Sequence, residues 1–122
     1  MTLVDTSVWI DHLRAKESEL IDLLLSGEVL MHPFIIGELA CGNLKNRSNI
    51  LQLMESLPEA TLATNKEVLY FIESNKLMGR GIGYIDAHLL ASTALSNHIS
   101  LWTRDKRLAG LSDSLGLASN LK

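Results

Sequence analysis

Apolar positions recur with two different spacings along this chain of 122 residues. Short continuous apolar runs predict buried strands at residues 2–5, 29–31, 60–63 and 98–102, with a short edge strand at 115–118. Apolar residues spaced three or four positions apart predict helices at residues 6–13, 18–26, 33–44, 50–57, 65–78, 86–95 and 108–111. Strands that alternate with helices are typical of an α/β fold with a mainly parallel sheet.

Glycine, proline and capping residues mark several of the predicted boundaries. Gly27 is well placed to end the second helix, and Pro33 is a natural first residue of the third. Asn65 is expected to cap the fifth helix. The glycine-rich turn at residues 79–83 lacks the spacing of a dinucleotide-binding loop or a P-loop. We therefore expect it to be a turn that brings the next helix close to its neighbours.

Four carboxylates occupy unusual places in this pattern. Asp86 heads the least polar segment of the chain, and no further charge occurs before residue 104. Glu38 is the only charged residue between positions 29 and 44. Asp5 lies where the first predicted strand passes into a helix, and Asp105 follows the strand predicted at 98–102. Each of these acids needs a partner that accounts for its charge.

Each acid also has a purely structural alternative. Asp86 could cap its own helix, and Asp5 could form an Asx-turn that caps the first helix. Glu38, in the middle of an apolar helix, could form a buried ion pair with an arginine such as Arg104. Asp105, flanked by basic residues, could be a solvated charge in a surface turn.

The four acids taken together favour a shared site. In a parallel sheet, ligands bind beyond the carboxyl ends of the strands, where these acids are expected to converge. Two carboxylates about 4 Å apart repel each other by roughly 4 kcal/mol at an effective dielectric constant near 20, so such a cluster must take up protons or bind a cation. Oxygen ligands without a histidine or cysteine cluster indicate Mg²⁺ or Mn²⁺, ions that serve phosphodiester hydrolysis.

Composition narrows the remaining possibilities. A hydrophobic content of 47% supports one core, so we expect residues 1–122 to form a single domain. The formal charge of −3 excludes a general polyanion binder, and RNA would have to be contacted through bound cations or a local basic patch such as Arg80, Arg104, Lys106 and Arg107.

The sparse cysteine and the N-terminal sequence bear on location. Cys41 is the single cysteine, so no internal disulfide can form, and we expect it to pack against its apolar helix. Asp5 comes too early for a secretory signal peptide. The longest uncharged stretch, residues 87–103, is too short to span a bilayer. We therefore expect a cytoplasmic protein. The four histidines show no metal-ligand spacing, and we expect none of them to be catalytic.

Four motifs, in order, give the chain a family resemblance. They are Val4-Asp5-Thr6-Ser7, Gly37-Glu38-Leu39, Gly83-Tyr84-Ile85-Asp86-Ala87-His88-Leu89-Leu90-Ala91 and Leu101-Trp102-Thr103-Arg104-Asp105-Lys106-Arg107-Leu108. With these motifs the chain resembles the PIN-domain ribonucleases over nearly its whole length, and more narrowly the VapC-type toxins of bacterial type II toxin–antitoxin (VapBC) pairs.

The resemblance implies a PIN-like three-layer fold with a parallel sheet of four to five strands flanked by helices. It implies a metal-dependent endoribonuclease toxin in which Asp5, Glu38, Asp86 and Asp105 are catalytic and hold metal-activated water. It further implies that Asp5 and Asp86 bind Mg²⁺ or Mn²⁺ directly, with nearby hydroxyl groups from Thr6, Ser7 and Thr103. The implied partners are the RNA substrate, a second copy of the chain in a homodimer, and a cognate VapB-type antitoxin whose C-terminal segment blocks the acidic pocket.

One position departs from the family pattern. Many members carry a further acid a few residues beyond the position of Asp105, often followed by an aromatic residue, whereas this chain has Arg107 and Leu108. The fourth acidic role therefore falls on Asp105 alone, with Asp113 as a distant substitute.

Two other functions compete with a nuclease. A non-catalytic PIN-like RNA- or protein-binding module would carry acids that are structural, and divalent ions would then change its stability little. A phospho-receiver domain has a doubly wound fold of similar length and an acidic rim. Phospho-receiver domains typically carry adjacent acids after the first strand, whereas Asp5 has no acidic neighbour.

Overall fold

The sheet lies at the centre of the molecule and is parallel throughout. The computed structural model describes all 122 residues and contains the strands β1 (Thr2–Val4), β2 (Val29–Leu30) and β3 (Ser100–Trp102), in the order β2-β1-β3. A single bridge from Met31 to Glu59 widens the sheet beyond β2, and one from Leu101 to Ala118 widens it beyond β3. The sheet thus has three strands with one bridged residue pair beyond each edge, where four to five strands were expected.

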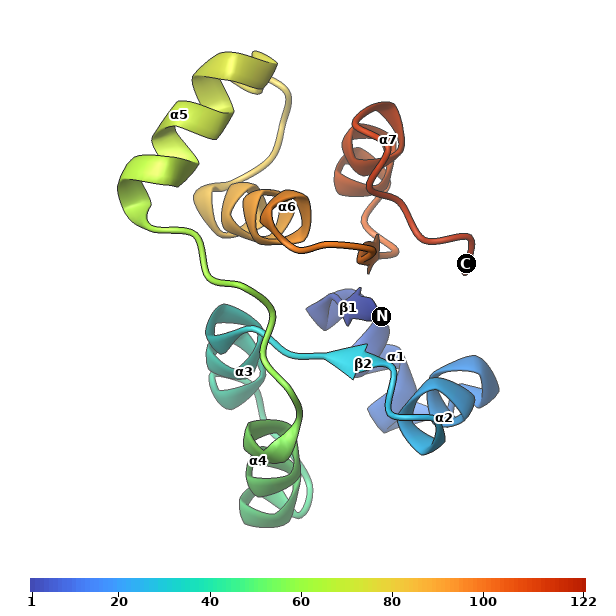
Figure 1. Ribbon diagram of the computed structural model, residues 1–122. Coiled ribbons are helices and arrows are strands. Elements are labelled where there is room, and N and C mark those ends of the chain that lie inside the picture. Colours follow the sequence, from blue (N-terminus) through green and yellow to red (C-terminus); the bar gives the residue numbers. More distant parts are fainter.

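Seven helices flank this sheet. They are α1 (Thr6–Arg14), α2 (Ser18–Leu25), α3 (Pro33–Ala40), α4 (Arg47–Ser56), α5 (Asn65–Asn75), α6 (Tyr84–Leu95) and α7 (Lys106–Ser114). Figure 1 shows α3, α5 and α6 to the left of the strands, α2 to the right and α7 above them. Helix α6 packs on β3, α5 packs on α6, and α3 contacts both α1 and α4. The expected arrangement of helices around a parallel sheet is confirmed. None of the helices combines the length and hydrophobicity needed to cross a membrane.

Several predicted boundaries need correction. The predicted strand at 60–63 is replaced by the single bridge at Glu59. Helix α3 begins at Pro33, as expected, but ends at Ala40, and Cys41 just beyond it is exposed rather than packed. Helix α5 is capped by Thr64 instead of Asn65, because the Thr64 hydroxyl accepts from the Glu67 backbone N–H while the Glu67 carboxylate accepts from the Thr64 N–H.

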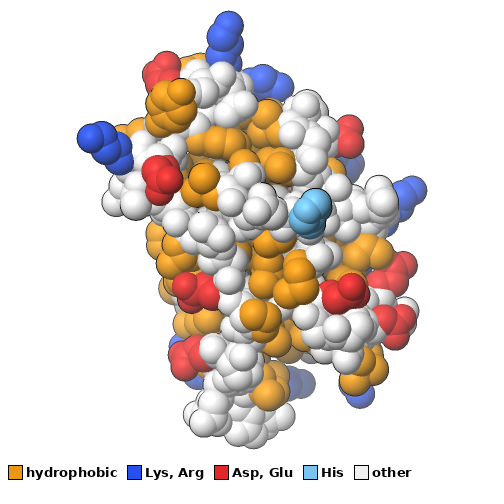
Figure 2. All heavy atoms as spheres, in the orientation of Figure 1, with side chains coloured by type: hydrophobic (Ala, Val, Ile, Leu, Met, Phe, Trp, Pro, Cys, Tyr) orange, Lys and Arg blue, Asp and Glu red, His pale blue; other side chains and the backbone are white.

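The core centres on β1, the first strand in the sequence and the middle strand of the sheet. Leu3 and Val4 are completely buried, as are Leu89 and Leu90 of α6. Figure 2 shows hydrophobic side chains gathered in the middle of one face of the molecule, with most of the Lys and Arg side chains at its edges. Because β1 and β3 are parallel neighbours, the residues that follow them lie at the same edge of the sheet.

Candidate active site

Asp5 lies at the end of β1 and is 6% exposed. Its backbone N–H still donates to the Trp102 carbonyl at 2.9 Å, so the sheet fixes its position. Its own carbonyl then accepts from the N–H groups of Val8 and Trp9, which begins α1. The Asp5 carboxylate makes no cap bond to that helix. The Asx-turn alternative therefore does not apply, and the carboxylate is free to interact with other side chains.

Two hydroxyl groups hold this carboxylate from one side. Ser7 Oγ donates to Asp5 Oδ2 at 2.8 Å, and Thr103 Oγ1 donates to the same oxygen at 2.7 Å. Each hydroxyl has a single proton, and each in turn accepts a backbone N–H, from Arg104 at 2.9 Å and from Asp105 at 3.1 Å. Both donors therefore require an acceptor at Oδ2, and Oδ1 remains available for another partner.

Glu38 approaches from α3 and is exposed. Its Oε1 accepts a hydrogen bond from Thr6 Oγ1 at 2.7 Å, which ties α3 to the first residue of α1. The alternative of a buried ion pair with Arg104 or Arg80 is wrong, because Glu38 is exposed and pairs with neither arginine. The Arg104 Nη1 group donates to Asp11 and Glu17, both at 2.7 Å.

Asp86 lies in the first turn of α6, three residues after the helix N-cap, Gly83. Its pKa is raised, first by burial and then by the negative charge of Asp5, with smaller contributions from Asp105 and Glu38. A hydrogen bond with the Gly83 backbone acts in the opposite direction. The Asp86 carboxylate thus forms a hydrogen bond at the start of its helix and is also repelled by the charges of the other three acids.

Asp105 caps α7, and its Oδ1 accepts from the Leu108 N–H at 3.0 Å. The side chain is exposed, so the structural alternative of a solvated turn residue is partly right. Its second oxygen, Oδ2, has no recorded hydrogen bond. Asp105 also follows Thr103 by two residues, which puts it at the edge of the sheet where Asp5 lies.

The donor set suits a hard divalent cation. The ligands on offer are carboxylate oxygens, and the free Oδ1 of Asp5 and the unfavourable charge at Asp86 would both gain from a cation. As the side chains stand, no three His, Cys, Asp or Glu groups are close enough together to hold an ion. The residues therefore fit such an ion in chemistry, and binding would draw the mutually repelling carboxylates inward.

A cluster of rings beside the acids was not foreseen from the sequence. His32 follows β2 and is 2% exposed, and burial, with His88 nearby, lowers its pKa to about 4. The ring of His88 contacts Phe34 and Tyr84 edge to face, with centroids 4.7 and 4.6 Å apart. Burial also lowers the pKa of His88. The only sequence signal was the four-residue spacing of Tyr84 and His88, which puts both on one face of α6.

Two of the basic residues near the acids already have partners within the protein, Arg104 and Arg107. Arg104, one of the four residues suggested either as an RNA-contacting patch or as a solvated basic turn, is already paired: besides its two carboxylate partners it donates to the Lys122 carbonyl at 3.1 Å and lies 5.6 Å from the Trp102 ring. Arg107 covers Gly81 in the turn before Asp86. A Cβ at Gly81 would lie 2.7 Å from Arg107 Cδ.

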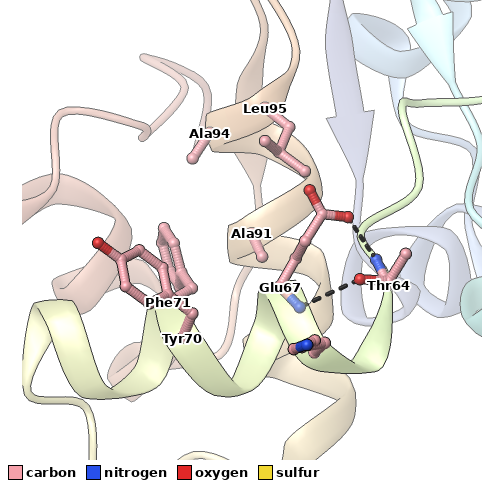
Figure 3. Close-up of a pocket in the computed structure, with 8 residues that line it drawn as sticks. Thr64, Glu67, Tyr70, Phe71, Ala91, Ala94 and Leu95 are labelled. Atoms are coloured by element: carbon pink, nitrogen blue, oxygen red, sulfur yellow. Dashed lines mark hydrogen bonds between the residues drawn. The ribbon is translucent and has the colours of Figure 1, made fainter.

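Two hollows flank these groups. A pocket of about 570 Å³ lies between α5 and α6, where Figure 3 shows Phe71 and Tyr70 from one helix opposite Ala91, Ala94 and Leu95 from the other. None of the four acids lines it. A groove of about 800 Å³ lies between α1, α3 and the start of α4. Glu38 lines it, together with apolar side chains that include Ile10, Leu13, Leu39, Leu44 and Ile50.

Comparisons with known proteins agree with this architecture. The family model described as "PIN domain" matches residues 2–113. Ribonuclease VapC32 of Mycobacterium tuberculosis (strain CDC 1551 / Oshkosh) is 47% identical over 118 residues, which cover 97% of this chain and 95% of that protein. Ribonuclease VapC32 of the strain ATCC 25618 / H37Rv matches with the same values. These matches rule out a phospho-receiver domain. The chain belongs to the PIN-domain family and, within it, to the VapC type.

Proposed function

We propose that this chain is a cytoplasmic, Mg²⁺- or Mn²⁺-dependent endoribonuclease and the toxin of a toxin–antitoxin pair. The observation that carries the proposal is the electrostatic convergence on Asp86, whose pKa is raised by Asp5, Asp105 and Glu38 in addition to burial. Like charges gathered at the carboxyl ends of parallel strands favour a cation between them. The similarity to Ribonuclease VapC32 supports RNA as the substrate.

In this proposal the chain's own residues orient the reactants. Asp5 and Asp86 would hold the ion, which polarises the phosphodiester and lowers the pKa of water. Ser7 and Thr103 keep Asp5 in one orientation, with Oδ1 facing the site. Glu38, anchored by Thr6, accepts a proton from the attacking water, and Asp105 completes the acidic rim.

The bond changes follow from these roles. The water oxygen bonds to phosphorus, and the bond from phosphorus to the 3′ oxygen breaks. The products are a 5′ phosphate and a 3′ hydroxyl, whose proton comes from solvent. Exposed Arg80, Lys106 and Arg107 would contact flanking phosphates, and Arg104 would not, because its ion pairs already use it.

The same proposal includes two protein partners. We assign the groove beside Glu38 to the cognate VapB-type antitoxin, because its apolar floor would take hydrophobic side chains, while Glu38 on one hand and Arg14 and Lys45 on the other would pair with partner side chains of opposite charge. A segment bound there would cover Glu38 and keep RNA from the acids. A homodimer is proposed by analogy with the family.

The test is cleavage of bulk cellular RNA by the purified protein. We expect cleavage with Mg²⁺ or Mn²⁺, and loss of it in EDTA and in the variants Asp5→Asn and Asp86→Asn. Equal cleavage in all samples would identify a contaminating nuclease and refute the proposal.

A melting experiment separates the nuclease from a non-catalytic PIN-like module. A bound ion stabilises the folded state, so Mn²⁺ should raise the melting temperature of the wild type and have much less effect on Asp86→Asn. Glu59→Gln is a matched control, because Glu59 lies on the bridged edge of the sheet and is not one of the four acids. Little or no shift in any of the three proteins would favour the non-catalytic module.

A further inference from the structure

The ring cluster next to the acids has more exposed aromatic surface than packing alone requires. Tyr84 is 45% exposed and Phe34 is 37% exposed, whereas His88 between them is 4% exposed. The His88 ring stands nearly perpendicular to both, at 88° to Tyr84 and 69° to Phe34. The buried histidine thus supports two aromatic side chains that remain accessible to solvent.

The cluster also presents a polar edge. Asn65 Oδ1 accepts from the Tyr84 hydroxyl at 3.1 Å and lies 3.2 Å from His88 Nε2. Because an amide oxygen only accepts, that contact requires the proton of His88 to be on Nε2. The amide Nδ2 of Asn65 has no recorded partner, and the residue is exposed. Two hydrogen-bond donors are therefore available beside the two rings.

These groups adjoin the acids on two helices. Phe34 and Glu38 are four residues apart on α3 and lie on one face, about 6 Å apart along the helix axis. Tyr84 and Asp86 both lie in the first turn of α6, but two residues apart, so their side chains leave the helix on different faces. Phe34 is therefore the ring that lies beside a carboxylate, that of Glu38, and the cluster itself contains no Lys, Arg, Asp or Glu side chain.

Exposed aromatic rings with an adjacent amide donor match the chemistry of a nucleobase. Unpaired bases in RNA are bound by stacking on aromatic side chains and by hydrogen bonds to their edges. A phosphate would need positive charge, which the cluster lacks. We propose that Phe34, Tyr84 and Asn65 form a subsite for one unpaired base of the RNA, adjacent to the phosphodiester that is cleaved. This inference rests on the proposed nuclease function.

The experiment pairs a change in the protein with a change in the RNA. Short single-stranded oligoribonucleotides are prepared with every base present, or with an abasic residue on one or the other side of the cleaved bond. The ratio of kcat/KM for intact and abasic RNA is measured for the wild type, Phe34→Leu and Tyr84→Leu. Tyr70→Leu is the matched control, because Tyr70 is an exposed aromatic residue of α5 outside the cluster.

The expected result is a loss that depends on both partners. Removing the base on one side should lower kcat/KM of the wild type by about tenfold or more, and should have much less effect on Phe34→Leu and Tyr84→Leu. Tyr70→Leu should behave like the wild type. Equal ratios in all four proteins would overturn the inference, because a merely structural role for the rings lowers the activity on both RNAs alike.

Two further outcomes are separated by independent measurements. Sedimentation that shows a smaller assembly for Phe34→Leu and Tyr84→Leu, but not for Tyr70→Leu, would assign the rings to contacts between copies and overturn the inference. If the wild type cleaves no RNA, the proposed function fails, and binding is measured directly with RNA that carries 2-aminopurine, whose fluorescence changes on stacking. A change that Phe34→Leu abolishes would then support the subsite, and no change would refute it.

Discussion

His32 should make the stability of this protein fall between neutral and mildly acidic pH. The side chain caps α3, where its Nδ1 accepts from the Phe34 N–H at 3.0 Å, and it is 2% exposed. Protonation would remove this acceptor and leave a charge buried at the positive end of a helix. Burial and the proximity of His88 accordingly lower the pKa of His32 from 6.5 to about 4.

The sign and size of the effect follow from linkage. Because the unfolded chain binds the proton more readily, the stability contributed by neutral His32 is fully present above pH 6.5 and is lost as the pH falls towards 4. The full difference is about 3 kcal/mol, of which about 2 kcal/mol is already lost at pH 5. For a chain of this size, 2 kcal/mol corresponds to a fall of roughly 6 to 10 °C in melting temperature.

The variant His32→Asn isolates this term. Asparagine caps helices well and does not titrate in this range, so the variant should lose less stability than the wild type between pH 7 and 5. His98→Asn is the control, because His98 is exposed and has a positive φ of 58° that asparagine accepts. Urea unfolding at each pH gives the free energies. If His32→Asn and the wild type lose stability in parallel, protonation of His32 does not cause the loss.

Three further predictions concern the hydroxyl pair, the glycine turn and Asp86. In a urea titration, Thr103→Val should destabilise the protein by about 1.5–3 kcal/mol, because it removes a hydrogen-bond donor from a buried carboxylate. Thr93→Val is the control. It removes a bond to the carbonyl of Leu89 in the same helix and should cost less than about 1 kcal/mol. Gly81→Ala should lower the free energy of unfolding by about 1–2 kcal/mol, because Gly81 has a φ of +83°. Gly37→Ala in α3 should instead raise it by about 0.5–1 kcal/mol. Equal effects of the two substitutions would contradict the strain argument. Without divalent ions, Asp86→Asn should have a higher melting temperature than the wild type at neutral pH, because the raised pKa of Asp86 means that its ionised form destabilises the fold. The difference between the two melting temperatures should shrink as the pH falls. A lower melting temperature for the variant in EDTA would refute this.

The sequence predicted the elements better than their contacts. Periodicity and capping residues located all seven helices and the three strands, because these depend on local patterns. The α5 cap was misassigned to Asn65, although Glu67 three residues after Thr64 was a legible capping-box signal. The strand predicted at 60–63 failed because a short apolar run does not specify whether it pairs.

Glu38 and Asp86 were singled out by their apolar surroundings and Asp5 and Asp105 by the strands that precede them, but local patterns did not predict the partners of these acids. The family resemblance suggested that three hydroxyl groups would lie near the acids, those of Thr6, Ser7 and Thr103. Each of them does donate to a carboxylate. The pairing of Arg104 with Asp11 was not predicted, because it depends on how α1 faces the end of β3, which no local pattern encodes. The ring cluster of His88 and Phe34 joins α6 to α3 and is likewise a tertiary feature.

The place of β1 in the sheet has a consequence for biosynthesis. The strand β1 and the Asp5 that follows it leave the ribosome before their neighbour β3 and the Thr103 hydroxyl, which come 98 residues later. A nascent chain therefore holds its central strand unpaired on one side, with Asp5 lacking one of its two donors, until β3 and Thr103 have emerged. The acidic site can form only after β3 and Thr103 have left the ribosome, so a partner made beforehand has time to meet the chain before the site is complete.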